Sequence, residues 1–210
     1  MNADEVGVPS PSGVTVQLIH GNPIVDRAAE IYQEMLAEAG VKGSATAQPP
    51  QGRAPWRTTF HVAVGPDGTA LGALHATLGN LDDLSLSHLV DPDQRLAAPI
   101  CEAAAIAVLP EATGLGVTEL LYRSVYCFAR RHGALSLTAL LDPLTLELFQ
   151  DDYGISFRAL GPVASHIGLE LVAAGGELHE LEEGARRSRP EFFAFLTEPF
   201  TAAEKTRFGL

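Results

Sequence analysis

The first half of the chain alternates between apolar and polar residues with a period of two, which is typical of half-buried strands. The strands that this pattern predicts are Val14–Ile19, Thr59–Val64 and Leu71–Leu78. A Gly-Pro-Asp-Gly turn separates the last two strands, so we expect them to pair as an antiparallel hairpin. Between the first two strands, apolar residues spaced three and four apart predict a helix from Asn22 to Gly40, and the polar stretch 42–56 predicts a loop.

The second half of the chain combines longer apolar runs with helical periodicity. The strands predicted there are Pro99–Leu109, Leu135–Leu140, Ile155–Leu160 and Ile167–Ala174. A helix is expected over Thr118–Arg131, with Arg123 and Arg130 on its outer, polar face. An Asp-Pro pair begins a second helix that spans Asp142–Gly154, and Ser188–Pro190 begins a final one. This order of elements predicts an α+β fold.

Composition limits the classes of protein to which the chain can belong. With 46% hydrophobic and 19% charged residues among 210, it can bury a core, and we expect one domain at 14–210 behind a loose tail at 1–13. The net charge of −12 disfavours binding to nucleic acid. The apolar runs are too short to span a membrane, and the first residues lack a basic leader, so a cytoplasmic protein is expected. Cys101 and Cys127 are expected to be buried thiols, and no metal site is expected.

The most informative segment is a glycine turn between a long strand and a helix. Gly114 and Gly116 at a helix N-terminus let the backbone approach a ligand closely and direct N–H groups at it. The order of strand, glycine turn, helix, short strand and Asp-Pro helix resembles the GCN5-related N-acyltransferase superfamily. The family motif Q/R-x-x-G-x-G/A reads here as Glu111–Gly116. The resemblance implies a mixed central sheet of about six to seven strands, flanked by helices and splayed open where phosphopantetheine binds.

The resemblance also assigns binding residues. Those expected to hold the pantetheine thioester are Ala107, Val108, Leu109, Thr113, Gly114, Leu115, Gly116 and Val117. Within this set, a backbone N–H of residues 107–109 is expected to bind the thioester carbonyl. The proton-donating tyrosine of many relatives falls at Phe149, which cannot donate a proton, and Tyr153 or Tyr122 could replace it. The donor would be a co-substrate, acyl-phosphopantetheine or acyl-CoA, with no tightly bound cofactor.

A narrower resemblance lies within the long strand. Cys101–Val108 is similar to the E-x-S-R-[FL]-x-V strand of acyl-homoserine-lactone synthases and long-chain N-acyl amino acid synthases. Glu102 matches that pattern, whereas Ala104 and Ala105 replace its Ser-Arg pair. The closing segment Ser188–Phe193 is also similar to the tails of such synthases. Because these relatives commonly take acyl groups from an acyl carrier protein, the resemblance implies that class of donor.

The charge at the first position of the glycine motif also bears on whether the donor is coenzyme A or an acyl carrier protein. Glu111 stands where relatives that use coenzyme A have a Gln or Arg beside the diphosphate, and one carboxylate–phosphate contact costs about 1 kcal/mol even in water. A carrier-bound phosphopantetheine has a single phosphodiester and is repelled less. Carrier proteins are themselves acidic, so docking requires local positive charge. The candidate docking residues are Arg123, Arg130, Arg131 and Arg158.

Two side chains are candidates for the base that deprotonates the amine. Glu102 is ionisable within an apolar strand, where desolvation raises a carboxyl pKa, and His75 is the second candidate. The sequence therefore predicts an N-acyltransferase of specialised metabolism, monomeric or homodimeric, that moves an acyl group from an acyl carrier protein to an amine. Two alternatives remain open: a CoA-dependent small-molecule N-acetyltransferase, and an inactive binding module, because Glu111, Ala105 and Phe149 depart from the family pattern.

Overall fold

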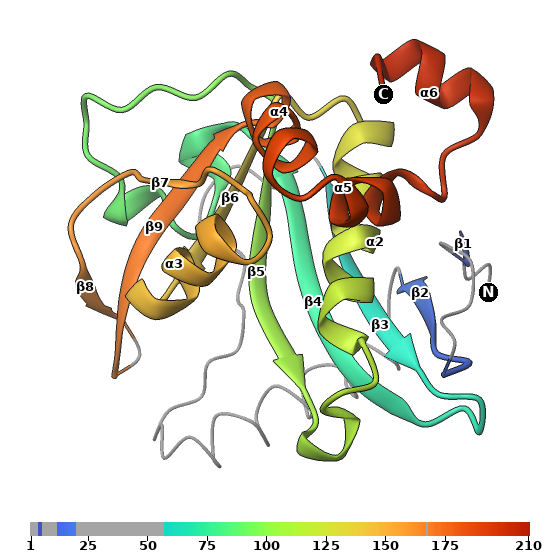
Figure 1. Ribbon diagram of the computed structural model, residues 1–210. Helices are drawn as coiled ribbons and strands as arrows, with labels where there is room; N and C mark the ends of the chain where they lie inside the picture. Colours follow the sequence, from blue (N-terminus) through green and yellow to red (C-terminus); the bar gives the residue numbers. More distant parts are fainter. Residues whose placement is uncertain (1–3, 6–11, 20–56, 167) are drawn as a thin grey trace.

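The computed structural model describes residues 4–5, 12–19, 57–166 and 168–210 (Figure 1). The predicted helix from Asn22 to Gly40 and the predicted loop 42–56 lie outside these residues. The strands are β1 (Asp4–Glu5), β2 (Thr15–Ile19), β3 (Arg57–Val64), β4 (Ala70–Gly79), β5 (Ile100–Val108), β6 (Ser136–Leu141), β7 (Arg158–Ala159), β8 (Ala164–His166) and β9 (Leu169–Glu177). The helices are α2 (Val117–Arg131), α3 (Pro143–Asp151), α4 (Leu178–Ser188), α5 (Pro190–Thr197) and α6 (Ala202–Phe208).

The described strands form one mixed sheet in the order β1-β2-β3-β4-β5-β6-β9-β7, with β8 attached to β9. All neighbours are antiparallel except β5 and β6, which are parallel because α2 crosses over between them. The predicted α+β class and mixed sheet are therefore confirmed. The sheet has nine strands rather than six or seven, because β1, β7 and β8 add pairs of only two or three residues.

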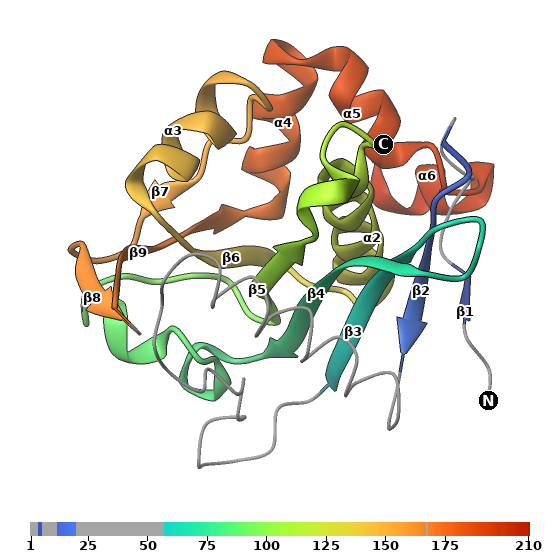
Figure 2. The ribbon, with the colours of Figure 1, turned by 90° about the horizontal axis from the view of Figure 1, so that it is seen from below.

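The helices α2 to α6 cover one face of the sheet (Figure 2). Helix α2 lies along β2 to β5, and it buries Leu121 and Val125 in the main core. Close contact at its first turn requires glycine in β4, because a Cβ on Gly72 would lie 2.9 Å from the Val117 Cγ1 atom and 2.9 Å from the Ala107 carbonyl oxygen. The sheet and the start of α2 are thereby held at a fixed distance.

The opposite face of the sheet is covered in part by the connection between β4 and β5. Leu84 and Leu86 from this connection are fully buried against Ile100 of β5 and Leu160. The connection begins at a short 3-10 helix, Leu81–Asp83. Both faces of the central strands are therefore packed, and this accounts for their nearly continuous apolar sequence.

Near the C-terminus, the predicted elements differ from the observed ones. The predicted strand Ile155–Leu160 is reduced to the two residues of β7, because Ile155 and Phe157 enter the core under α3 and their N–H groups donate to the Phe149 and Ile155 carbonyls at 2.9 and 2.8 Å. The sequence prediction also missed α4 and α6. Asp4–Glu5, inside the predicted tail, pairs with β2.

Candidate functional site

The sheet opens between β5 and β6. These strands pair only from Ile100 opposite Ser136 to Ala103 opposite Ala139. Strand β5 then continues along β4 to Val108, and β6 continues along β9. Beyond Ala103, no described strand pairs with this edge of β5, so its backbone groups can bind a ligand. We call the space between these two edges the β5–β6 opening.

A β-bulge in β5 lies at the start of the opening. Leu74 is opposite Ile106, but His75 is opposite Ala104, so Ala105 is an extra residue in β5. A bulge bends its strand and increases the local twist. It therefore helps to turn β5 away from β6 directly after their last paired residues.

The bulge and the β4 ladder decide which N–H groups face the opening. The Leu109 N–H donates to the Leu71 carbonyl in β4 at 2.9 Å, so it is not available to a thioester. Because directions alternate along a strand, the Ala107 N–H also faces β4, whereas the N–H groups of Ile106 and Val108 face the opening. Of the predicted residues 107–109, only Val108 directs its N–H group into the opening. Ile106 also does so, and the sequence prediction did not include it, because a bulge leaves no clear signal in the sequence.

The glycine turn lies at the N-terminus of α2. Gly114 and Gly116 have φ angles of 81° and 73°, in the left-handed region that favours glycine, and no described atom lies within 4 Å of a Cβ built at either position. No side chain caps the N-terminus of α2, so its first N–H groups are available to an anion. Glu111 is exposed on the 3-10 helix Pro110–Ala112 that leads into this turn. The predicted motif thus forms an open backbone cradle with one carboxylate beside it.

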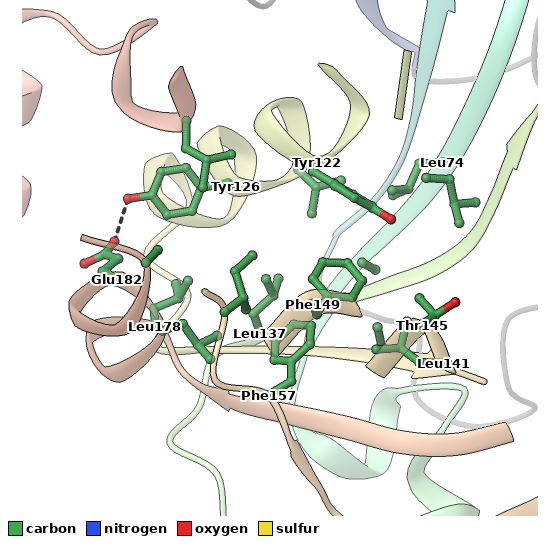
Figure 3. A pocket seen from close by; sticks show the side chains of 18 of the residues that line it. Leu74, Tyr122, Tyr126, Leu137, Leu141, Thr145, Phe149, Phe157, Leu178 and Glu182 are labelled. Carbon is green, nitrogen blue, oxygen red and sulfur yellow. Dashed lines mark hydrogen bonds between the residues drawn. The ribbon is translucent and has the colours of Figure 1, made fainter. Parts of the chain in front are cut away.

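A cavity of about 110 Å³ lies between the opening and the covering helices (Figure 3). Its sheet side is formed by Leu74, Ala103, Ile106, Leu137, Ala139 and Leu141. Helices α2 to α5 form the other side, with mostly aliphatic and aromatic side chains. The polar residues in its wall are Tyr122, Tyr126, Thr145 and Glu182. An apolar group that enters through the opening would be removed from water here.

Three aromatic rings pack together in the region where the sequence resemblance implies a proton donor. The ring centroid of Tyr122 is 5.0 Å from that of Phe149 and 5.8 Å from that of Tyr153. The Tyr153 hydroxyl donates to the Glu119 carboxylate at 3.2 Å. Burial, and to a smaller extent the negative charge of Glu119, raises the pKa of Tyr153 to about 12. Burial also raises the pKa of Tyr122, whose hydroxyl lies in the cavity wall (Figure 3). Both phenols are therefore protonated at neutral pH. Of the two, Tyr122 is the one that lines the cavity.

Glu102 lies on the other face of β5, under the connection between β4 and β5. Its side chain is 1% exposed and accepts hydrogen bonds from the backbone N–H groups of Ser85 and Leu86, at 2.8 and 3.1 Å, and from the Ser85 hydroxyl. Burial raises the pKa of Glu102, and the hydrogen bonds from Ser85 and Leu86 offset part of this effect. The carboxylate is thus fixed in position and more basic than an ordinary glutamate.

His75 lies on the same face of the sheet as Glu102. Thr77 is directly opposite Glu102, so His75 and Glu102 are diagonal neighbours whose Cα atoms lie about 7–8 Å apart. The His75 ring packs on Phe60 at 4.7 Å, and its buried Nδ1 atom has no hydrogen-bond partner among the residues that the structure describes. Burial lowers the pKa of His75 to about 4, so the ring is neutral but weakly basic at pH 7. The sheet brings the two predicted bases together, and the cavity lies on its other face.

The predicted carrier-protein docking residues are not grouped in one basic surface. Arg123, expected on the outer face of α2, is only 4% exposed; it pairs with Glu198 at 2.8 Å and stacks over Phe195 at 4.3 Å. Arg130 pairs with the buried Glu182 at 2.8 Å. Helices α4 and α5 cover this side of α2, and the sequence pattern of one helix cannot show that.

The other two arginines are also engaged. Arg131 pairs with Glu204 of α6 at 2.8 Å. Arg158 lies on β7, at the other end of the strand order, and donates to the Arg95 carbonyl at 3.3 Å. The prediction that these four side chains form a docking face is therefore wrong, since three of them are neutralised by carboxylates of the same chain.

Cys101 and Cys127 are free and buried, as predicted. Within the described ranges, no three His, Cys, Asp or Glu side chains are grouped as metal ligands. None of the described helices has both the length and the apolar character needed to cross a membrane.

Comparison with known proteins shows that solved structures share this fold. No family model and no curated protein matches the sequence. Among solved structures, FeeM, an N-acyl amino acid synthase from uncultured soil microbes, is 11% identical with a TM-score of 0.63, over 84% of this chain and 97% of that one. BjaI, a CoA-dependent acyl-homoserine lactone synthase, is 15% identical with a TM-score of 0.59, over 89% of this chain and 82% of that one. TofI, in complex with an inhibitor and MTA, is 14% identical with a TM-score of 0.59, over 85% of this chain and 98% of that one. The chain therefore has the fold of these synthases, which is the GCN5-related N-acyltransferase fold that its sequence predicted.

Proposed function

We propose that this protein is an N-acyltransferase that moves an acyl group from a phosphopantetheine thioester to an amine. The observation that carries the proposal is the β5–β6 opening, which has an apolar cavity behind it and the uncapped N-terminus of α2 beside it. An extended thioester needs these three features: N–H groups for its phosphate, a strand edge for its amides and an apolar space for its acyl chain. The likeness to FeeM and BjaI supports the same class of reaction.

The reaction forms one C–N bond and breaks one C–S bond. The amine nitrogen attacks the thioester carbonyl carbon, and the negative charge on the carbonyl oxygen is stabilised by N–H groups of β5. We assign the Ile106 N–H to this role, because it faces the opening and its side chain lines the cavity. When the tetrahedral intermediate collapses, the thiolate leaves and takes up a proton. Tyr122 is the proposed proton donor, since its hydroxyl is protonated and lies in the cavity wall.

The amine must lose a proton, and we assign this step to Glu102. Its raised pKa makes it a stronger base than an exposed glutamate, whereas the lowered pKa of His75 makes that ring a weaker base than ordinary histidine. Both side chains lie on the face opposite the cavity. The acceptor is therefore proposed to approach from this face and the acyl chain to occupy the other, with the β5–β6 opening between them.

The preferred donor is proposed to be a carrier-protein thioester. Glu111 supports this, because its exposed carboxylate adjoins the cradle in which coenzyme A would place a diphosphate. Residues 108–122 and 140–153, which contain the turn, the first half of α2 and α3, include no Lys or Arg. The acidic residues in these two segments are Glu111, Glu119, Asp142, Glu147, Asp151 and Asp152. The phosphopantetheine arm, with one phosphodiester, is repelled less by this surface than coenzyme A is, but an acidic carrier protein is repelled by it too, so the proposed preference rests on Glu111 beside the cradle.

Release of free thiol tests the function. The protein is mixed with acyl-carrier-protein, acyl-CoA and acyl-N-acetylcysteamine thioesters together with a panel of amines, and the amide product is identified by mass spectrometry. Gly114→Ala is expected to raise the KM for the donor, because the added Cβ occupies the open cradle. Gly133→Ala is the matched control, since Gly133 also has a positive φ and open space around it but lies after α2. Absence of amine-dependent thiol release with every donor would refute the proposal.

A further inference from the structure

We infer that the acyl group is short, about four to six carbon atoms, and that a buried polar network at the inner end of the cavity sets this limit. The inference rests on the proposed acyl transfer and specifies its substrate. The volume of the cavity gives the size: about 110 Å³ is less than the roughly 150 Å³ of an apolar cavity that accommodates the six carbons of benzene.

The register of the strands gives the cavity a direction. Ile106 and Leu141 belong to the parts of β5 and β6 that have separated, so they mark the end nearest the opening. Leu137 lies opposite Cys101 in the part where β5 and β6 still pair, and Leu178 follows directly after β9 at the same end. Figure 3 shows Tyr126 and Glu182 beside Leu178, away from Leu74, Leu141 and Thr145. The inner end therefore includes two leucines and one polar pair among its lining residues.

The polar pair belongs to a closed network. The Tyr126 hydroxyl donates to the Glu182 Oε1 atom at 2.6 Å, and the Arg130 Nη2 group donates to the Glu182 Oε2 atom at 3.0 Å. The same Arg130 group donates to the Phe208 carbonyl at 2.8 Å. Glu182 is 7% exposed, and each of its two oxygens already accepts a hydrogen bond from the chain itself. An alkyl chain gains nothing from these groups.

Such a network makes the length limit sharp. An apolar inner end could yield to a longer chain by changing side-chain rotamers, at a cost of about 1–3 kcal/mol. A chain that pushed between Tyr126 and Glu182 would also leave the buried Tyr126 hydroxyl without its acceptor, while Glu182 would keep Arg130, and an unpaired buried hydroxyl is costly. We therefore expect the rate to fall steeply once the acyl chain exceeds the cavity, rather than to decline gradually.

The test measures kcat/KM across acyl-N-acetylcysteamine thioesters of 2 to 12 carbons, because these donors carry no phosphate. The wild-type optimum is expected at about four to six carbons, with a fall of at least tenfold by ten carbons. Tyr126→Ala and Leu137→Ala are expected to move the optimum by two carbons or more toward longer chains. Phe128→Ala is the matched control, since Phe128 is also a buried aromatic residue of α2 but does not line the cavity, and its optimum should not move.

A rate that increases up to ten or twelve carbons in the wild type, or an unchanged optimum in both cavity variants, would overturn the inference. If Tyr126→Ala does not fold, Leu137→Ala alone decides the result. If no thioester reacts, the proposed function fails, but the cavity can still be tested by thermal shift with n-alkanols of 4 to 12 carbons. Greatest stabilisation by the four- to six-carbon alcohols then supports the size limit, and greatest stabilisation by the longest alcohols refutes it.

Discussion

Replacing Glu102 with glutamine tests two roles of this carboxylate separately. The carboxylate accepts three hydrogen bonds: from the Ser85 N–H and hydroxyl and from the Leu86 N–H. Glutamine has one oxygen, so it can keep the two bonds made to Oε1, but its amide group then faces the Ser85 N–H that was bound at 2.8 Å. The loss of one charge-assisted hydrogen bond at a buried backbone N–H costs about 2 kcal/mol. For a chain of this length the melting temperature falls by roughly 4–8 °C.

The second expected effect of Glu102→Gln is on catalysis. If Glu102 accepts the proton from the amine, kcat falls by about 10²-fold or more at a temperature at which the variant is still folded. Asp83→Asn is the matched control, because Asp83 also anchors the β4–β5 connection, by accepting from the Asn80 N–H at 3.0 Å, but does not lie on β5. The control is expected to lose stability and to keep kcat.

The effect of Glu102→Gln on the unfolding free energy should change with pH in a defined direction. Because burial raises the folded-state pKa of Glu102 above its ordinary value of about 4.3, its contribution to stability is fully present below that pH and is lost as the pH rises through the raised pKa. The difference in unfolding free energy between wild type and Glu102→Gln should therefore be larger at pH 4.5 than at pH 8, measured by urea denaturation. An unchanged melting temperature would refute the anchoring argument, and an unchanged kcat would refute the assignment of the base.

Three further predictions concern the donor cradle and the packing beneath it. Glu111→Gln is expected to lower the KM for acyl-CoA about fivefold, equivalent to about 1 kcal/mol, and to change the KM for a carrier-protein thioester less; equal changes would remove the argument for a carrier protein. Raising the NaCl concentration from 0.05 to 0.5 M should lower the KM for acyl-CoA, because salt screens like charges, and a rising KM would show that attraction dominates. Gly72→Ala should reduce the unfolding free energy by about 1–3 kcal/mol, because its Cβ would lie 2.9 Å from both Val117 and the Ala107 carbonyl; calorimetry that shows no loss would contradict this packing.

Local sequence signals were sufficient for the central elements of the fold. The alternating runs on both sides of the Gly-Pro-Asp-Gly turn predicted the β3–β4 hairpin, and the apolar period of α2 predicted its limits to within one residue. The glycine turn was also predictable, because Gly114 and Gly116 adopt backbone angles that other residues avoid. These features depend on residues close together in the chain, and their physical causes are therefore visible in the sequence.

The C-terminal part was predicted less well, because its structure depends on distant contacts. Ile155 and Phe157 have the composition of a strand, yet they enter the core under α3. Arg123 has the spacing of an exposed residue on an amphipathic helix, but α5 covers it and supplies Phe195 as a stacking partner. The periodicity of one segment carries no information about which other segment will cover it.

The sequence by itself determined the α+β class, the glycine cradle, Glu111 beside it and the candidate bases Glu102 and His75. Only the tertiary structure decided how these parts are arranged. The bulge at Ala105 and the end of the β5–β6 ladder create the opening, and the contact of Tyr126 with Glu182, 56 residues apart, closes the inner end of the cavity. Both depend on strand register and on contacts between distant segments, and these are set by the packing of the whole chain rather than by any local pattern.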